Sequence, residues 1–176
     1  MTDDMQSAPS KHVELRGIDF AYTDTGSGSV VLDAHGLSSS RANNRRMGLA
    51  DFGAVASVGL RLISYDARGH GETSGTAAAE DYTWAALALD LLALADHFSP
   101  DSPVCGIGSS MGTGTLAHAA VQRPDRFERL VLSAPPTAWE TRAGQTDMYR
   151  TMADTAETSD PQTVETLLSQ APVPPV

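Results

Sequence analysis

Ser110 has the surroundings that a nucleophilic serine needs. It stands in the middle of a Gly-Ser-Ser-Met-Gly segment (108–112), after the apolar run 103–108 and before the small-residue segment 111–121. This order predicts a strand, a sharp turn and a helix, and the two glycines leave room for the turn. Such a turn lifts the hydroxyl clear of the sheet, at a helix N-terminus that favours negative charge. We therefore predict that Ser110 attacks a carbonyl carbon.

The same segment has a less specific interpretation. Glycine and serine are common, so Gly-x-Ser-x-Gly also arises by chance, and it suits an ordinary turn that opens a helix. The apolar run before the motif favours the nucleophile. So do the small residues of the segment that follows it, such as Gly114, Ala117 and Ala120.

The pattern along the chain predicts the elements that position Ser110. Apolar runs of strand length alternate with longer segments whose apolar residues have helical spacing. This alternation indicates an α/β fold with a mostly parallel sheet and helices on both faces. Strands are expected at 12–20 (two short edge strands), 30–34, 60–65, 103–108 and 129–134, and helices at 47–58, 82–98 and 111–121.

Two acidic residues stand out in this pattern. Asp81 directly precedes the helix expected at 82–98, and aspartate is a favoured N-cap, so we predict that it caps that helix. Asp33 interrupts the apolar run 30–34, and the pattern offers no reason for a carboxylate there.

Four segments, in order and at suitable spacing, resemble the α/β-hydrolase superfamily, in particular its serine esterases and lactonases. Residues 30–37 are similar to the family's strand ending in His-Gly. Residues 66–73 resemble its Asp-x-Arg-Gly-x-Gly-x-Ser loop, with threonine in the last position. Residues 109–112 are similar to its His-Ser-Met-Gly, with serine in place of histidine, and 123–136 resemble its passage from helix to next strand. The resemblance covers residues 12–136 and identifies the chain as the N-terminal part of such a hydrolase.

The resemblance implies roles for particular residues. Ser110 is the nucleophile, and the backbone N–H groups of Leu37 and Met111 form the oxyanion hole. Asp66 and Arg68 are expected to tie their loop down rather than to take part in the chemistry.

A catalytic base and acid are missing from the expected positions. The family order is serine, then Asp or Glu, then His, and these partners follow later strands of the sheet. The last expected strand here ends near Ala134. His70 as base and Glu140 as acid are the nearest substitutes, but neither role is favoured, and Glu140 is expected to be a solvated residue of the cap helix. We therefore expect a fold incomplete at its C-terminal side, inactive alone, with the acid and His supplied by a C-terminal fragment or second chain of the same protein.

The character of the chain changes after Pro136. Residues 137–169 have helical spacing, with a break where Asp160 suits an N-cap and Pro161 suits a first helical turn. We divide the chain into a flexible tail (1–10), the N-terminal part of the α/β-hydrolase core (11–136) and the start of a helical cap (137–176). Four apolar cap residues either line a substrate pocket or pack on the core: Trp139, Met148, Tyr149 and Met152.

Composition excludes several function classes. A net charge of -10 and a pI near 4.7 argue against partners such as nucleic acid or an anionic membrane surface. No apolar run is long enough to span a bilayer, and Cys105, the single cysteine, fits a cytoplasmic protein. The histidines lack metal-ligand spacing, so we expect no metal and no other cofactor.

Three functions remain open on the sequence. The first is hydrolysis of a small-molecule ester, lactone or related carbonyl substrate, including C–C cleavage. The second is a non-catalytic ligand-binding or interaction protein of the same fold. The third is a haloperoxidase-like or acyltransferase activity of the same serine. The carboxylate nucleophile of dehalogenases and epoxide hydrolases is excluded, because Ser110 occupies its position.

Overall fold

The computed structural model describes residues 9–46, 52–136, 144 and 146–169. These residues fall into two compact units, one ending at Pro135 and one beginning at Pro136.

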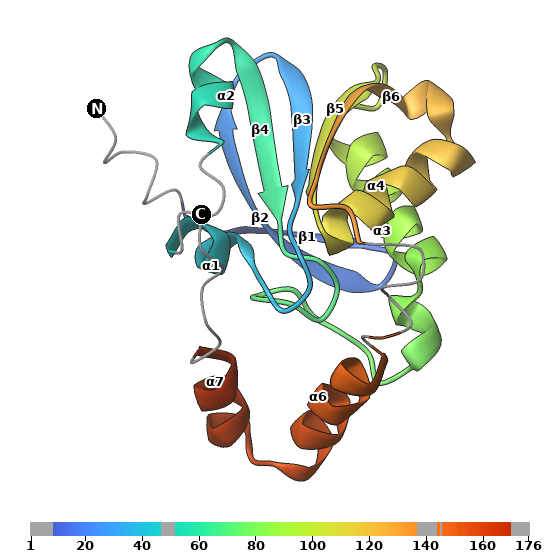
Figure 1. Cartoon of the computed structure of the whole chain (residues 1–176). Coiled ribbons are helices and arrows are strands. Elements are labelled where there is room, and N and C mark those ends of the chain that lie inside the picture. The colour runs from blue at the N-terminus through green and yellow to red at the C-terminus, as the bar shows by residue number, and fades with distance from the viewer. Residues whose placement is uncertain (1–8, 47–51, 137–143, 145, 170–176) are drawn as a thin grey trace. The chain divides into compact units, whose positions relative to one another are not determined.

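The first unit is built on a six-stranded sheet in the order β1-β2-β4-β3-β5-β6 (Figure 1). Strands β4, β3, β5 and β6 run parallel to one another, whereas β2 is antiparallel to both of its neighbours, β1 and β4. The strands are β1 (Lys11–Leu15), β2 (Ile18–Gly26), β3 (Ser29–Ala34), β4 (Leu60–Tyr65), β5 (Val104–Ser109) and β6 (Phe127–Ser133). The mostly parallel α/β sheet expected from the sequence is confirmed.

Helices cover both faces of this sheet, as the alternation of elements predicts. Because crossovers between parallel strands are right-handed, the helices between β3 and β4 lie opposite those that follow β4 and β5. Helix α2 packs on β4 and β2, and α3 packs with α4 on the other face (Figure 1). The helices of this unit are α1 (Arg41–Arg46), α2 (Gly53–Ser57), α3 (Trp84–Phe98) and α4 (Met111–Gln122), with 3-10 turns η1 (Ala79–Tyr82) and η2 (Pro124–Arg126).

The core lies between α3, α4 and the sheet. Leucines of α3 that recur at helical spacing are fully buried, among them Leu91 and Leu94, and they meet Leu32 and Ile63 of the central strands. Burying each such side chain contributes about 2 kcal/mol. This layer therefore fixes the C-terminal ends of β3 and β5, where Ser110 lies.

The structure corrects two details. Thr83, not Asp81, caps α3: its Oγ1 accepts a hydrogen bond from the Ala86 N–H at 3.3 Å. Asp81 lies one turn earlier, where its carboxylate accepts from the Thr76 hydroxyl at 2.6 Å. The second edge strand is also longer than expected. Strand β2 continues to Gly26 because β4 supplies a partner, and it lies inside the sheet rather than at its edge.

The second unit contains α6 (Thr146–Thr158) and α7 (Pro161–Ser169). Asp160 caps α7 as predicted, accepting the Thr163 N–H at 3.0 Å. Met148, Tyr149 and Met152 are exposed on α6, while Trp139 lies outside the described residues. Among the helices that the structure describes, none is both long and apolar enough to cross a bilayer.

Candidate active site

Ser110 sits on a strained turn between β5 and α4. Its backbone has φ 49° and ψ -106°, although residues with a side chain strongly prefer negative φ. Such a conformation costs about 1–3 kcal/mol and persists where the surrounding structure enforces it. The strain turns the side chain out of the strand at the first residue ahead of the helix.

The two flanking glycines explain how the turn is held so tightly. A Cβ at Gly108 would lie 2.7 Å from the backbone of Gly112, and a Cβ at Gly112 would overlap the carbonyl oxygen of Ala34. The backbones of β5, α4 and β3 therefore approach more closely than any side chain permits. The spacing of glycines around the serine follows from this packing.

Hydrogen bonds to β6 hold the elbow in place. The Ser110 N–H donates to the Ser133 carbonyl at 3.0 Å. The Thr113 hydroxyl lies 2.9 Å from the carbonyl oxygens of both Gly108 and Ser133, so it spans the two strands. The sequence pattern did not single out Thr113 or Ser133, because their contacts join segments about twenty residues apart.

The loop after β3 lies directly against Ser110. A Cβ at Gly36 would be 3.5 Å from the Ser110 Cβ. Leu37, which follows, is 51% exposed, and Met111 is the buried first residue of α4. The structure thus brings the two predicted oxyanion-hole residues to the region of Ser110.

His35 orients this loop through both ring nitrogens. The Ala67 N–H donates to Nε2 at 2.9 Å, so the hydrogen is on Nδ1, which donates to the Gly36 carbonyl at 2.8 Å. Burial is the main reason that the pKa of His35 is lowered, which keeps the ring neutral. Gly36 O and Leu37 N–H share one peptide plane, so the bond to Gly36 also sets the direction of the Leu37 N–H.

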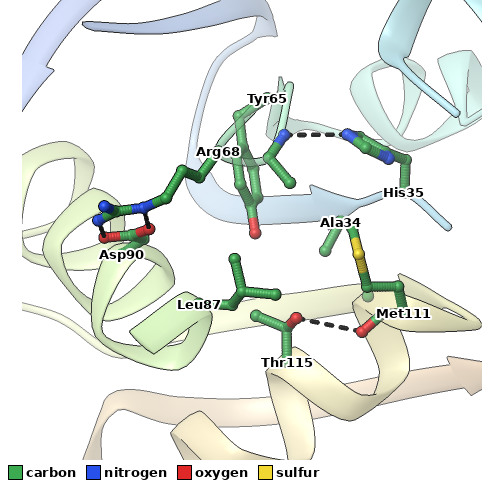
Figure 2. A pocket seen from close by; sticks show the side chains of 10 residues that line it. Ala34, His35, Tyr65, Arg68, Leu87, Asp90, Met111 and Thr115 are labelled. Atoms are coloured by element: carbon green, nitrogen blue, oxygen red, sulfur yellow. Dashed lines mark hydrogen bonds and ion pairs between the residues drawn. The ribbon is translucent and has the colours of Figure 1, made fainter. Parts of the chain in front are cut away.

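The loop after β4 is tied down by two buried carboxylates. Asp66 accepts hydrogen bonds from the backbone N–H groups of Arg41 and Glu72 and from the Arg41 guanidinium, at 2.8–3.0 Å. Arg68 donates two bonds of 2.8 Å to Asp90 of α3, and Figure 2 shows the guanidinium and carboxylate edge to edge. The prediction that Asp66 and Arg68 anchor their loop is confirmed.

Comparison with known proteins agrees with this geometry. The profile of the α/β-hydrolase fold matches residues 30–172. The chain belongs to the α/β-hydrolase family.

Relatives within the family act on different substrates by name. An epoxide hydrolase from Caballeronia sordidicola is 32% identical over 162 residues, covering 91% of this chain and 46% of the relative. The mouse sn-1-specific diacylglycerol lipase ABHD11 is 31% identical, covering 72% of this chain and 40% of the relative. A solved Vigna radiata epoxide hydrolase mutant superposes with a TM-score of 0.69 at 26% identity, covering 86% and 52% of the two chains. The chain spans less than half the length of the two curated relatives.

A small cavity lies beneath the α/β-hydrolase elbow (Figure 2). The Tyr65 hydroxyl points into it, toward Leu87 of α3 and Ala34 of β3. Its volume of about 10 Å³ accommodates a water molecule and no substrate. The site that receives a substrate is therefore not this cavity.

No described histidine is hydrogen-bonded to the Ser110 hydroxyl of this α/β hydrolase. His70 Nδ1 bonds the Arg68 carbonyl at 2.9 Å, and its ring lies 5.2 Å from that of His35. His118 stacks on Trp84, and His12 pairs with a surface carboxylate. Within the described segments, no side chain hydrogen bonds to the Ser110 hydroxyl. Glu140, the candidate acid, lies outside them.

Proposed function

We propose that this α/β hydrolase cleaves carboxylic esters, lactones or related carbonyl compounds through Ser110. The observation that carries the proposal is the strained conformation of Ser110 between two glycines that admit no side chain. Strain of this kind is maintained where an exposed, fixed hydroxyl is needed. The nearby Leu37 loop and the start of α4 support an oxyanion hole at the same place.

The chemistry follows from this arrangement. The Ser110 oxygen bonds to the carbonyl carbon while its proton passes to a base, and the carbonyl electron pair moves to oxygen. The N–H groups of Leu37 and Met111 stabilise that oxyanion by about 3 kcal/mol each. The oxyanion then collapses and expels the alcohol, which takes the proton from the base. Water attacks the acyl-serine ester in the same way and releases the acid.

The nucleophile favours carbonyl substrates over the epoxides named for several relatives. Attack of a serine oxygen on an epoxide leaves an ether, which water does not cleave under mild conditions. Attack on an ester leaves another ester, which the same base and oxyanion hole hydrolyse. Serine at the elbow therefore supports an acyl-serine cycle rather than epoxide opening.

A base and an acid must come from outside the described residues. The first unit holds Ser110 and the Leu37 loop, but among its described residues no side chain is bonded to the Ser110 hydroxyl. Positioned base catalysis contributes about 10²–10⁴-fold in rate. We propose that a C-terminal part of the same protein supplies both groups, in keeping with relatives more than twice the length of the matched region.

One observation favours a second candidate, a non-catalytic binding protein of this fold. The Ser110 hydroxyl lacks a hydrogen-bond partner among the described side chains, as a serine without a catalytic role would. Against it stands the cost of the strain, for which simple binding gives no reason.

Labelling with a fluorophosphonate probe separates the two candidates. We expect the complete protein to be labelled at Ser110 within minutes, and residues 1–176 alone to be labelled about 10²–10⁴-fold more slowly. Ser110→Ala should abolish labelling, whereas the neighbouring Ser109→Ala should retain it. A complete, folded protein that resists the probe at Ser110 contradicts the catalytic proposal and supports the binding protein.

A further inference from the structure

One row of side chains crosses the sheet on the face away from α3 and α4. Successive residues of a strand face opposite sides. Leu32 and Ala34 belong to the core beneath α3 and α4, so Asp33 between them points the other way. The register of the sheet aligns Asp33 with Ser64 of β4, Ile107 of β5 and Val131 of β6.

The packing at Gly106 shows that the row is continuous on that face. A Cβ at Gly106 would meet the side chains of Leu116 and Leu130, so Gly106 and Leu130 face α4. Their successors, Ile107 and Val131, therefore face the same side as Asp33.

This face is open toward β6. Val131 is 59% exposed, and Ile107, Ser64 and Asp33 are partly exposed. Strands of parallel sheets are normally covered on both faces, and an uncovered apolar edge strand promotes association. An element that packs on this row would therefore remove apolar surface from water and cover the edge strand.

The carboxylate of Asp33 restricts the chemical character of any element that covers this row. It accepts a hydrogen bond from Ser64, yet burial raises the pKa of Asp33 to about 6. An element lying on Ile107 and Val131 would remove still more water from Asp33. A wholly apolar covering would force Asp33 to take up a proton, at a cost that grows with its pKa, whereas a cationic side chain would stabilise the carboxylate, so a covering with a cation is favoured.

We propose that the C-terminal part of the same protein covers this row and places a Lys, Arg or His side chain against Asp33. This inference rests on the proposed function, in which a C-terminal part completes the fold. It adds that this part contacts Asp33 through a cationic side chain. Relatives are more than twice the length of the region matched here, so their folds contain further polypeptide to cover the face. The net charge of -10 on this chain also favours a basic contact in the part that joins it.

The carboxyl-carbon NMR shift of Asp33, followed against pH, tests the contact. The complete protein and residues 1–176 are compared, and the resonance is assigned with Asp33→Asn. A cationic partner should lower the pKa from about 6 in residues 1–176 to about 4 or less in the complete protein. A value that stays near 6 or rises overturns the proposal, as does a mature protein that ends at Val176.

Association of the separately produced C-terminal part gives a second measurement. At pH 7.5, Asp33→Asn should weaken binding to residues 1–176 by about 30-fold or more. Asp101→Asn, which removes an equal charge from the exposed loop before β5, should have little effect. Equal affinities for the two variants would overturn the proposed cationic contact with Asp33. A stable dimer of residues 1–176 through β6 would show that a second copy of this chain covers the face instead.

Fluorophosphonate labelling of the same samples keeps the two proposals separable. Labelling of Ser110 without a change in the pKa of Asp33 overturns the cationic contact alone. A lowered pKa of Asp33 without labelling of Ser110 supports the contact and contradicts the catalytic role.

Discussion

The backbone N–H of Ser110 donates a hydrogen bond to the carbonyl oxygen of Ser133, 3.0 Å away. This bond joins the strained turn to the end of β6, the edge strand of the sheet. Thr113 reinforces the link from the first turn of α4, since its hydroxyl reaches the Ser133 and Gly108 carbonyls. The geometry of Ser110 thus depends on a strand that comes after it in the sequence.

Thr113→Val tests this link. Loss of the bridging hydroxyl leaves the buried Gly108 carbonyl and the Ser133 carbonyl with fewer donors, so we expect the free energy of unfolding to fall by about 1 kcal/mol in urea denaturation. Thr115→Val is the matched control, because its hydroxyl bonds the Met111 carbonyl within the same helix and spans no strands. Equal losses for both variants would show that the bridge to β6 is not special.

Ser110→Gly should stabilise the protein while removing the hydroxyl of the proposed nucleophile. Glycine adopts a positive φ without steric cost, so relief of strain should raise the free energy of unfolding by about 1 kcal/mol. The melting temperature, measured by thermal denaturation, should rise with it. The neighbouring Ser109→Gly lies in β5 and should instead lower stability by about 1 kcal/mol. A loss of stability for both variants would contradict strain at Ser110.

Gly112→Ala should prevent the elbow from forming. The added Cβ overlaps the backbone carbonyl of Ala34, which belongs to the central strand β3 and has no freedom to move aside. We expect a loss of about 3 kcal/mol or more, seen as poor soluble yield and early thermal unfolding. Gly114→Ala is the control, since its Cβ meets the half-buried ring of Trp84, which can shift. A mild effect at Gly112 would refute this packing.

His35→Gln should change how stability depends on pH. Because burial lowers the pKa of folded His35, the unfolded chain takes up a proton first. The contribution of His35 to the stability of the wild-type protein is therefore fully present above the pKa of histidine in the unfolded chain, near 6.5. It declines as the pH falls below that value. We expect the difference in free energy of unfolding between wild type and His35→Gln, measured by denaturant titration, to become smaller as the pH is lowered from 8 to 5. The exposed His97→Gln should show no such trend, and a gap that widens in acid would contradict a buried neutral His35.

Local patterns were sufficient to locate the elbow that carries Ser110. The strand before Ser110, the helix after it and the flanking glycines are contiguous in sequence, so their geometry follows from short-range sterics. The strand at 60–65 and the cap at Asp160 were predicted for the same reason. The position of Leu37 beside the site came from resemblance to a family rather than from spacing.

Contacts between distant segments were decided by the tertiary structure. Thr83 displaced Asp81 as the cap of α3, because Asp81 is held by Thr76 and pairs with Arg68. Gly112 is required by Ala34, 78 positions earlier, and no local pattern records that contact.

The sequence by itself determined that a serine stands on a strand-turn-helix elbow in an α/β fold, because the residues that impose this turn are adjacent in the chain. The tertiary structure decided what surrounds that serine. Folding placed Ser133 and Gly36 against Ser110 and put Asp33 in an uncovered row beside Ile107. Burial and charge pairing depend on which segments meet across the sheet, and strand order and register exist only in the folded chain.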